Sequence, residues 1–86
     1  MNEGESGMKL FTKPGCEKCD WVKERMPEAA LKRVDSYDIM TADGLAELAY
    51  CELVGVAEKQ LPILLTRDGK VVTGAIRINK EIEGTC

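Results

Sequence analysis

The feature of this sequence that most constrains its fold is the alternation of short apolar runs with segments of helical periodicity. The apolar runs are bounded by proline, glycine or charged residues, as strands are. The longer segments repeat apolar side chains every three to four positions, as helices do. This order predicts an α/β domain, in which a β-α-β unit forms a parallel pair of strands and a hairpin completes the sheet. Strands are predicted over 8–12, 34–39, 61–66 and 71–73, and helices are predicted to begin near 16, 41 and 76.

Proline and glycine set the predicted helix ends. Pro27 lacks an N–H and its ring clashes with the carbonyl of Lys23, so the first helix should end near Met26. Pro27 also suits the first position of a second helical stretch. Thr41 is a suitable N-cap for the next helix and Gly55 a suitable stop. The apolar face of that helix is predicted at Ala42, Leu45, Ala46, Ala49 and Leu53.

The last third of the chain indicates a hairpin followed by a helix. Asp68-Gly69 stands between two β-rich runs, and the favoured turn needs positive φ at both central positions. Gly74 ends the second of these runs. Ile78 and Ile82 are four positions apart and are predicted to share the buried face of the final helix.

Length and composition fit one domain with a modest core. Of 86 residues, 44% are hydrophobic and 31% charged, which is enough apolar material for a small single core. Residues 1–7 are polar and acidic, so we expect a flexible tail there and a domain over 8–86. This tail lacks the positive charge and apolar run of a signal peptide, so a reducing, cytoplasmic location is expected.

Composition also excludes several classes of function. No stretch approaches the ~18 apolar residues that a membrane span needs. The net charge of −3 disfavours a nucleic-acid role based on a basic surface. The absence of histidine removes Ser-His-Asp and Cys-His catalysis and any metal site that depends on imidazole. We therefore expect that the protein binds neither nucleic acid nor membrane. A monomer is also expected.

The chemistry of the chain is concentrated in its cysteines. Cys16 and Cys19 form a Cys-x-x-Cys that directly follows a strand and a Pro-Gly turn. A helix N-terminus favours a thiolate through its unpaired N–H groups and its partial positive charge. Lys13 and Lys18 add positive charge, whereas Glu17 opposes it. In a reducing compartment this pattern is typical of a redox-active dithiol, in which Cys16 attacks a substrate disulfide and Cys19 resolves the mixed disulfide.

Two other interpretations of the cysteines remain. A structural zinc site needs four ligands, and the second pair would have to be Cys51 and Cys86, which are 35 positions apart. Inert thiols are the other alternative. Cys51 is expected to be a small buried thiol, Cys86 a residue of the mobile chain end, Trp21 part of the core or of a groove wall, and Asp20 a solvated acid.

Pro62 precedes the most apolar run of the chain. Proline removes a ladder hydrogen bond, so it belongs at an edge or at the start of a strand. A cis Leu61–Pro62 bond at a turn explains the residue equally well, and the sequence leaves both open.

Segment 12–19, Thr-Lys-Pro-Gly-Cys-Glu-Lys-Cys, resembles the active-site segment of glutaredoxins. Leu61-Pro62 is similar to the cis-proline of that family. Segment 72–74 lies where the family closes its glutathione groove with a glycine-containing turn. The resemblance covers about residues 8–84. It departs from the family between the cysteines, where Glu17-Lys18 replaces the usual Pro-Tyr, and in its single glycine at 74.

The resemblance implies a thioredoxin fold: a four-stranded mixed sheet in the order β-α-β-α-β-β-α, with helices on both faces. It implies that Cys16 is the nucleophile and Cys19 the resolving thiol. No metal is expected at the site. Pro62 would pack in cis against the pair, presenting the Leu61 backbone to an extended substrate. Lys13 would stabilise the thiolate or meet a glutathione carboxylate. The expected substrate-binding residues are Lys13, Pro14, Leu61, Pro62 and Gly74.

The expected substrates are protein or low-molecular-weight disulfides. No resident cofactor is expected; glutathione as co-substrate, or a thioredoxin-type reductase, would supply electrons. The unusual Glu17-Lys18 pair leaves a second function open. In that case the same fold is a binding module that holds a partner at Pro62, or a metal or cluster on Cys16. A selenium- or arsenic-handling reductase is a third possibility.

Overall fold

The computed structural model describes residues 7–84. Most of the predicted tail, and Cys86 with it, lie outside the described residues. The elements are β1 (Met8–Thr12), α1 (Glu17–Arg25), α2 (Glu28–Leu31), β2 (Val34–Asp38), α3 (Ala42–Tyr50), α4 (Val54–Lys59), β3 (Ile63–Leu65), β4 (Val71–Thr73) and α5 (Ala75–Gly84).

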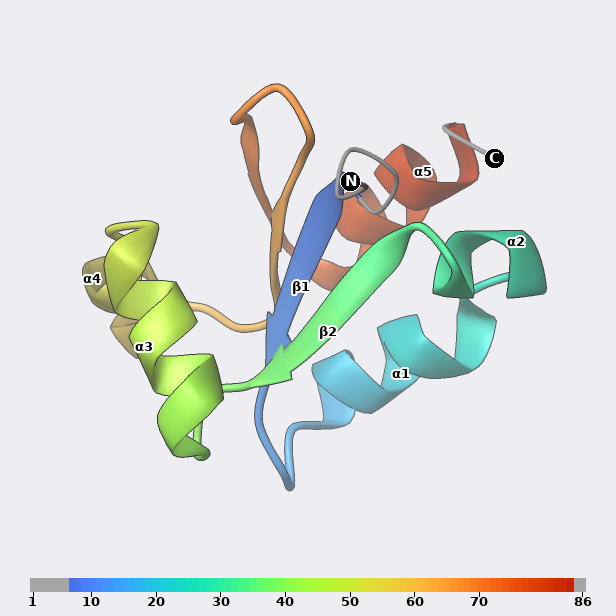
Figure 1. Cartoon of the computed structure of the whole chain (residues 1–86). Coiled ribbons are helices and arrows are strands. Elements are labelled where there is room, and N and C mark those ends of the chain that lie inside the picture. The colour runs from blue at the N-terminus through green and yellow to red at the C-terminus, as the bar shows by residue number, and fades with distance from the viewer. Residues whose placement is uncertain (1–6, 85–86) are drawn as a thin grey trace.

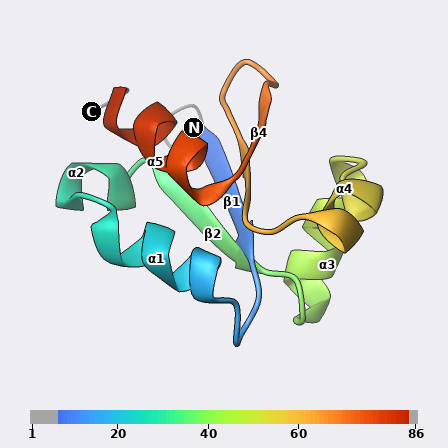
Figure 2. The same cartoon turned by 180° about the vertical axis from the view of Figure 1, so that it is seen from behind.

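The four strands form one open mixed sheet in the order β2-β1-β3-β4. β1 and β2 are parallel, whereas β3 is antiparallel to both β1 and β4. Helices cover both faces: α3 and α4 lie on one side, and α1 and α5 on the other (Figure 1). Seen from behind, α1 and α5 lie beside each other on the left of the sheet (Figure 2). The predicted α/β domain with a four-stranded mixed sheet is confirmed.

Each face of the sheet has its own apolar core, because successive strand residues point to opposite sides. On the α1 and α5 side the core includes Leu10, Val22, Leu64 and Ile78. On the α3 and α4 side it consists of Phe11, Leu48, Leu53 and Ile63. The burial predicted for Ile78 and Ile82 is confirmed.

The break after α1 forms as predicted, with one difference. α1 ends at Arg25, and the Met26 N–H donates to the Lys23 carbonyl at 3.3 Å. Pro27 is the N-cap of α2 and not its first helical residue, because its ψ of 159° is extended. The helix therefore begins one residue later, at Glu28.

The predicted apolar face of α3 is wrong. Leu45 is 50% exposed, while Gly44 and Leu48 face the interior. The rotation of the helix follows from Gly44, which approaches the backbone carbonyl of Asp38 too closely for any side chain. Leu53 is buried, but it lies beyond the helix. The remaining members of the predicted face, Ala42, Ala46 and Ala49, are exposed.

Gly55 does not end this helix, contrary to the prediction. Thr41 caps α3 as expected, since its hydroxyl accepts a hydrogen bond from the Gly44 N–H at 3.0 Å. The helix ends at Tyr50, and Glu52 turns the chain with a φ of 62°. Gly55 lies inside α4, which the sequence did not predict. A non-glycine residue with positive φ has no clear sequence signal, so the break was not visible.

The hairpin between β3 and β4 forms, but only Gly69 has positive φ, at 92°. The Gly69 N–H donates to the Thr66 carbonyl at 3.0 Å, and the Thr66 N–H donates to the Lys70 carbonyl at 2.9 Å. This pattern is a turn with one left-handed glycine at its end, so the expected second positive φ at Asp68 is wrong. β3 is also shorter than predicted, because Pro62 has no N–H to donate.

Within the part of the chain that the structure describes, no helix is long and apolar enough to cross a membrane.

Candidate functional site

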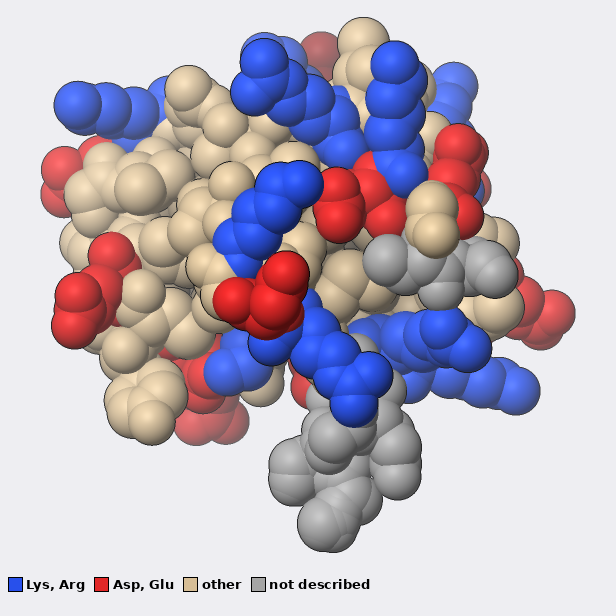
Figure 3. Space-filling model, turned by 90° about the horizontal axis from the view of Figure 1, so that it is seen from above, with Lys and Arg blue, Asp and Glu red and all other residues tan. Residues whose placement is uncertain are grey.

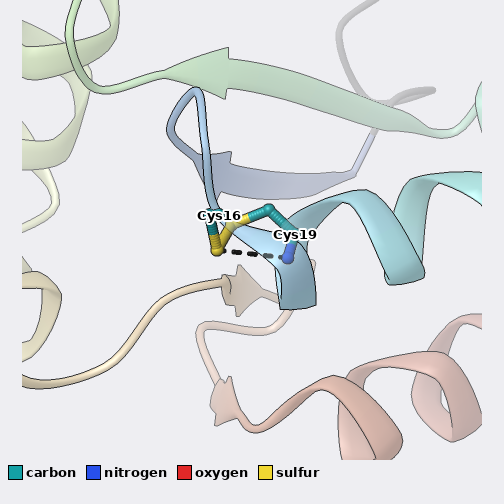
Figure 4. Close-up of a disulfide and its surroundings, with 2 residues drawn as sticks. All are labelled: Cys16 and Cys19. Carbon is teal, nitrogen blue, oxygen red and sulfur yellow. Dashed lines mark hydrogen bonds between the residues drawn. A yellow bond between two sulfur atoms is a disulfide. The ribbon is translucent and has the colours of Figure 1, made fainter.

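The Cys-x-x-Cys stands where the chain leaves β1 and enters α1. The turn between them is exposed, and Gly15 takes a φ of 77° that favours glycine. Cys16 is the N-cap of α1, with extended backbone (φ −96°, ψ 109°). Its sulfur is joined to that of Cys19 in a disulfide, with the two Cα atoms 5.2 Å apart (Figure 4). The predicted position at a helix start is confirmed.

The two cysteines differ in exposure. Cys16 is half-buried, whereas Cys19 is 0% exposed and belongs to the core. Of the two residues, only Cys16 is therefore open to a partner in solution. A reagent or substrate must meet Cys16 first, and Cys19 is within bonding reach of whatever Cys16 has captured.

A hydrogen bond at the start of α1 favours negative charge on the Cys16 sulfur. The Cys19 N–H donates to Cys16 Sγ at 3.2 Å, shown by the dashed line in Figure 4. This sulfur takes the place that a Ser or Asp oxygen holds in an ordinary N-cap. A thiolate there accepts a stronger, charge-assisted bond and faces the positive end of the helix dipole.

The charged residues around the pair are exposed. Lys13 and Lys18 stand on the turn and on the first turn of α1, and Glu17 lies between the cysteines. Asp20 is exposed, so the prediction of a solvated acid is confirmed. Trp21 packs against the core with part of its ring covered by the guanidinium of Arg25, 4.1 Å from the ring centroid.

The sequence left open whether Pro62 stands at the start of a strand or in a cis peptide bond, and both are true. The Leu61–Pro62 bond is cis, and β3 begins directly after it, at Ile63. Pro62 is fully buried and Leu61 half-buried.

The sheet register brings three predicted segments to one end of the sheet. Phe11 pairs with Ile63, and Ile63 pairs with Thr73. The residue after Phe11, the residue before Ile63 and the residue after Thr73 therefore lie at the same end of the sheet. These residues are Thr12, Pro62 and Gly74, and the turn that leads to Cys16 leaves from the first of them.

An open groove of about 500 Å³ lies beside this end of the sheet. Lys18 contributes to it from α1, and Thr73 and Gly74 from the end of β4. Gly74 is the one predicted substrate-binding residue in its lining; Lys13, Pro14, Leu61 and Pro62 are not part of it. Gln60 and Arg77 also line the groove, and neither was among the predicted site residues. The sequence did contain a signal for Arg77, because this cation follows three residues after the glycine at the predicted turn.

A second cluster of titratable groups lies on the α3 side of the sheet. Lys9 Nζ lies 2.5 Å from Glu47 Oε2, and this hydrogen bond raises the pKa of Lys9 above its ordinary 10.5. Burial raises the pKa of Tyr37 beside it. Cys51 is half-buried rather than buried, because it is the C-cap of α3, and its thiol lies 4.0 Å from the same Glu47 oxygen.

Among residues 7–84, no group of three or more His, Cys, Asp or Glu side chains is arranged to hold a metal ion. Comparison with known proteins found no match to a family model, a curated protein or a solved structure.

Proposed function

We propose that the protein is a thiol–disulfide oxidoreductase with a thioredoxin fold of the glutaredoxin type. The observation that supports this best is the asymmetric pair at the start of α1: a half-buried Cys16, a fully buried Cys19 within disulfide distance, and a backbone N–H that donates to Cys16 Sγ. A purely structural disulfide needs no such asymmetry. A dithiol that exchanges with substrates does, because one sulfur must be open and the other protected.

The reaction begins with the reduced pair. The Cys16 thiolate attacks one sulfur of a substrate disulfide; a Cys16–substrate bond forms, the substrate S–S bond breaks, and the second substrate sulfur leaves as a thiolate that takes a proton from solvent. The helix N-terminus stabilises the attacking thiolate and places it at the surface. Burial keeps Cys19 from reacting with solution disulfides in its place.

The second step uses Cys19. Its thiol loses a proton and attacks Cys16 Sγ; the Cys16–Cys19 disulfide forms, the Cys16–substrate bond breaks, and the substrate sulfur that Cys16 had captured leaves as a thiolate that takes a proton from solvent. Two electrons have then passed from the dithiol to the substrate. A thiol donor must return two electrons before the next cycle, and the proposal places this cycle in a reducing, cytoplasmic setting.

The arrangement of the sheet supports the proposed fold. One parallel and two antiparallel pairs make a mixed sheet of four strands with helices on both faces, as the glutaredoxin resemblance implied. The cis Leu61–Pro62 bond agrees with it as well.

The groove beside Gly74 supports glutathione as the electron donor. Glutathione carries two carboxylates, and Lys18 and Arg77 line this groove without an acidic neighbour in its lining. A thioredoxin-type reductase is the alternative donor. Recycling of the oxidised protein by glutathione alone, followed through loss of the Cys16–Cys19 disulfide, distinguishes the two.

The test is reduction of hydroxyethyl disulfide and of a protein disulfide by wild type and by three Cys→Ser variants. Cys16→Ser should abolish both activities. Cys19→Ser should form a mixed disulfide on Cys16 and fail to release a protein substrate. Cys51→Ser is the matched control and should behave as wild type, since its thiol belongs to the opposite side of the sheet. Full activity of Cys16→Ser would contradict the proposal.

A binding module is the second candidate, because the residues between the cysteines, Glu17 and Lys18, depart from the glutaredoxin pattern. Metal analysis of the purified protein, together with a thiol count at Cys16 and Cys19, separates the two functions. Bound metal that blocks alkylation of both thiols favours the binding module.

A further inference from the structure

We propose that the oxidoreductase acts on disulfides carried by acidic polypeptide segments, and that a basic groove along β4 and α5 binds these segments. This inference rests on the proposed function and names its substrate class. It begins from a second open groove of about 360 Å³, which is lined by all three residues of β4 and by Lys70, Arg77, Lys80 and Glu81.

The two grooves adjoin. Thr73 and Arg77 line both of them, so the groove beside the Cys-x-x-Cys continues along β4. Lys18 stands at the end next to the cysteines, and Lys70 and Lys80 stand at the far end. A segment that places its disulfide at Cys16 can therefore extend along this path.

The charge of the combined groove differs from that of the whole chain. The chain has 12 basic and 15 acidic residues, and its surface seen from above carries both signs interspersed (Figure 3). The combined lining has four cations, Lys18, Lys70, Arg77 and Lys80, and one acid, Glu81. Glu81 lies 3.5 Å from Lys70, which leaves a clear excess of positive charge. Such a local concentration of positive charge attracts negatively charged ligands.

The shape and apolar content of the groove indicate a polypeptide. β4 is an edge strand with β3 as its neighbour, so an extended chain can lie along its open side. Val71 is 44% exposed and Ile76 is 65% exposed beside the cations, which provides apolar contact for side chains. No aromatic residue lines either groove, whereas proteins that bind single-stranded nucleic acid use aromatic side chains for base stacking.

The test compares three peptides that carry the same fluorogenic disulfide flanked by four Asp, four Ser or four Lys residues. Each is reduced by a stoichiometric amount of reduced protein, so no electron donor is needed. At low salt the Asp peptide should react at least about tenfold faster than the Ser peptide, and the preference should fall towards parity at 0.5 M salt. The Lys peptide should be the slowest.

The variant Lys70→Glu/Lys80→Glu should remove the preference for the Asp peptide. Its reduction of the small neutral hydroxyethyl disulfide should be unchanged, because neither residue lines the groove beside the Cys-x-x-Cys. Lys23→Glu/Lys32→Glu is the matched control: both residues are exposed, both lie outside the grooves, and the change in net charge is the same. This control should keep most of the preference.

Fluorescence anisotropy on Cys16→Ser/Cys19→Ser separates docking from chemistry. Tight binding of the Asp peptide without any disulfide reduction by wild type would contradict the proposed function and leave the groove assignment standing. Equal reduction of all three peptides, an equal loss of preference in both charge variants, or equally tight binding of an oligothymidylate would overturn the groove assignment and leave the oxidoreductase standing.

Discussion

Gly44→Ala is the substitution whose effect on stability follows most directly from the structure. A β-carbon added there would lie 1.9 Å from the carbonyl oxygen of Asp38 and 2.5 Å from its carbon. Ordinary C···O contacts lie near ~3.3 Å, so the start of α3 must move away from the end of β2 by about 1 Å or more in Gly44→Ala. The contact is with backbone, so no side-chain rotation relieves it.

The cost follows from the hydrogen bonds that this movement breaks. The Asp38 carbonyl accepts from the Thr41 N–H at 3.0 Å and from the Thr41 hydroxyl at 2.7 Å. The same hydroxyl accepts the cap bond from the Gly44 N–H. Each bond contributes roughly 1 kcal/mol, and Ala gains about 1 kcal/mol over Gly in a helix. The net loss in the free energy of unfolding is about 2 kcal/mol, or about 8–16 °C in Tm.

The assay is urea unfolding followed by circular dichroism, with Cys16–Cys19 held oxidised. Gly55→Ala in α4 is the control, because a β-carbon there meets nothing within 4 Å; it should be neutral or stabilising by up to about 1 kcal/mol. A Gly44→Ala variant as stable as wild type, alongside the expected behaviour of Gly55→Ala, would refute the reasoning.

Three further predictions concern other parts of the domain. Lys9 has a raised pKa in the folded state, so its ion pair stabilises the fold below about pH 10.5 and is lost as the pH rises through the folded value. Lys9→Met should therefore lose less stability between pH 9 and 11 than wild type, by under about 1 kcal/mol in urea titrations. The Thr66 hydroxyl lowers the pKa of Asp68 below 3.8, so this contribution is lost as the pH falls through that lowered value. In Thr66→Val the carboxyl pKa measured by NMR should rise, and an unchanged value would contradict the assignment. Ile78→Ala should cost about 2–5 kcal/mol because Ile78 is 0% exposed, whereas Ile76→Ala should cost less than about 0.5 kcal/mol; equal effects would refute the placement of α5.

Much of the fold could be predicted because local signals and tertiary packing agree. β1 was bounded by the Pro-Gly turn after Thr12, and α5 by the spacing of its two buried isoleucines. The start of α3 was predicted from Thr41, whose hydroxyl performs the expected cap. Thr41 therefore both marks the start of α3 and makes the hydrogen bond that caps it.

The face of α3 could not be predicted, because its rotation depends on a tertiary contact. The sequence offers small apolar residues around most of the helix, so periodicity alone does not select one face. The close approach of Gly44 to the Asp38 carbonyl makes the selection. α4 was missed for a related reason: Glu52 breaks the chain in a conformation that its residue type rarely adopts.

The candidate site, like the fold, could be predicted only in part. The cysteines and their place on α1 were evident from sequence, since the turn and the helix start are local features. The grooves were not evident from sequence, because Lys18, Gln60 and Arg77 come together only when β4 and α5 return beside α1. Sequence neighbours of the cysteines were expected to bind substrate, and Lys13 instead lies outside the groove lining.

The most direct test of the central claim is a redox titration of Cys16 and Cys19 in thiol/disulfide buffers, with alkylation and mass spectrometry to count the free thiols. A redox-active dithiol predicts one reversible two-electron transition, in the range of about −180 to −280 mV that glutaredoxins, thioredoxins and isomerases occupy. Cysteines that never pair across this range, or that resist alkylation until a chelator is added, would contradict the account.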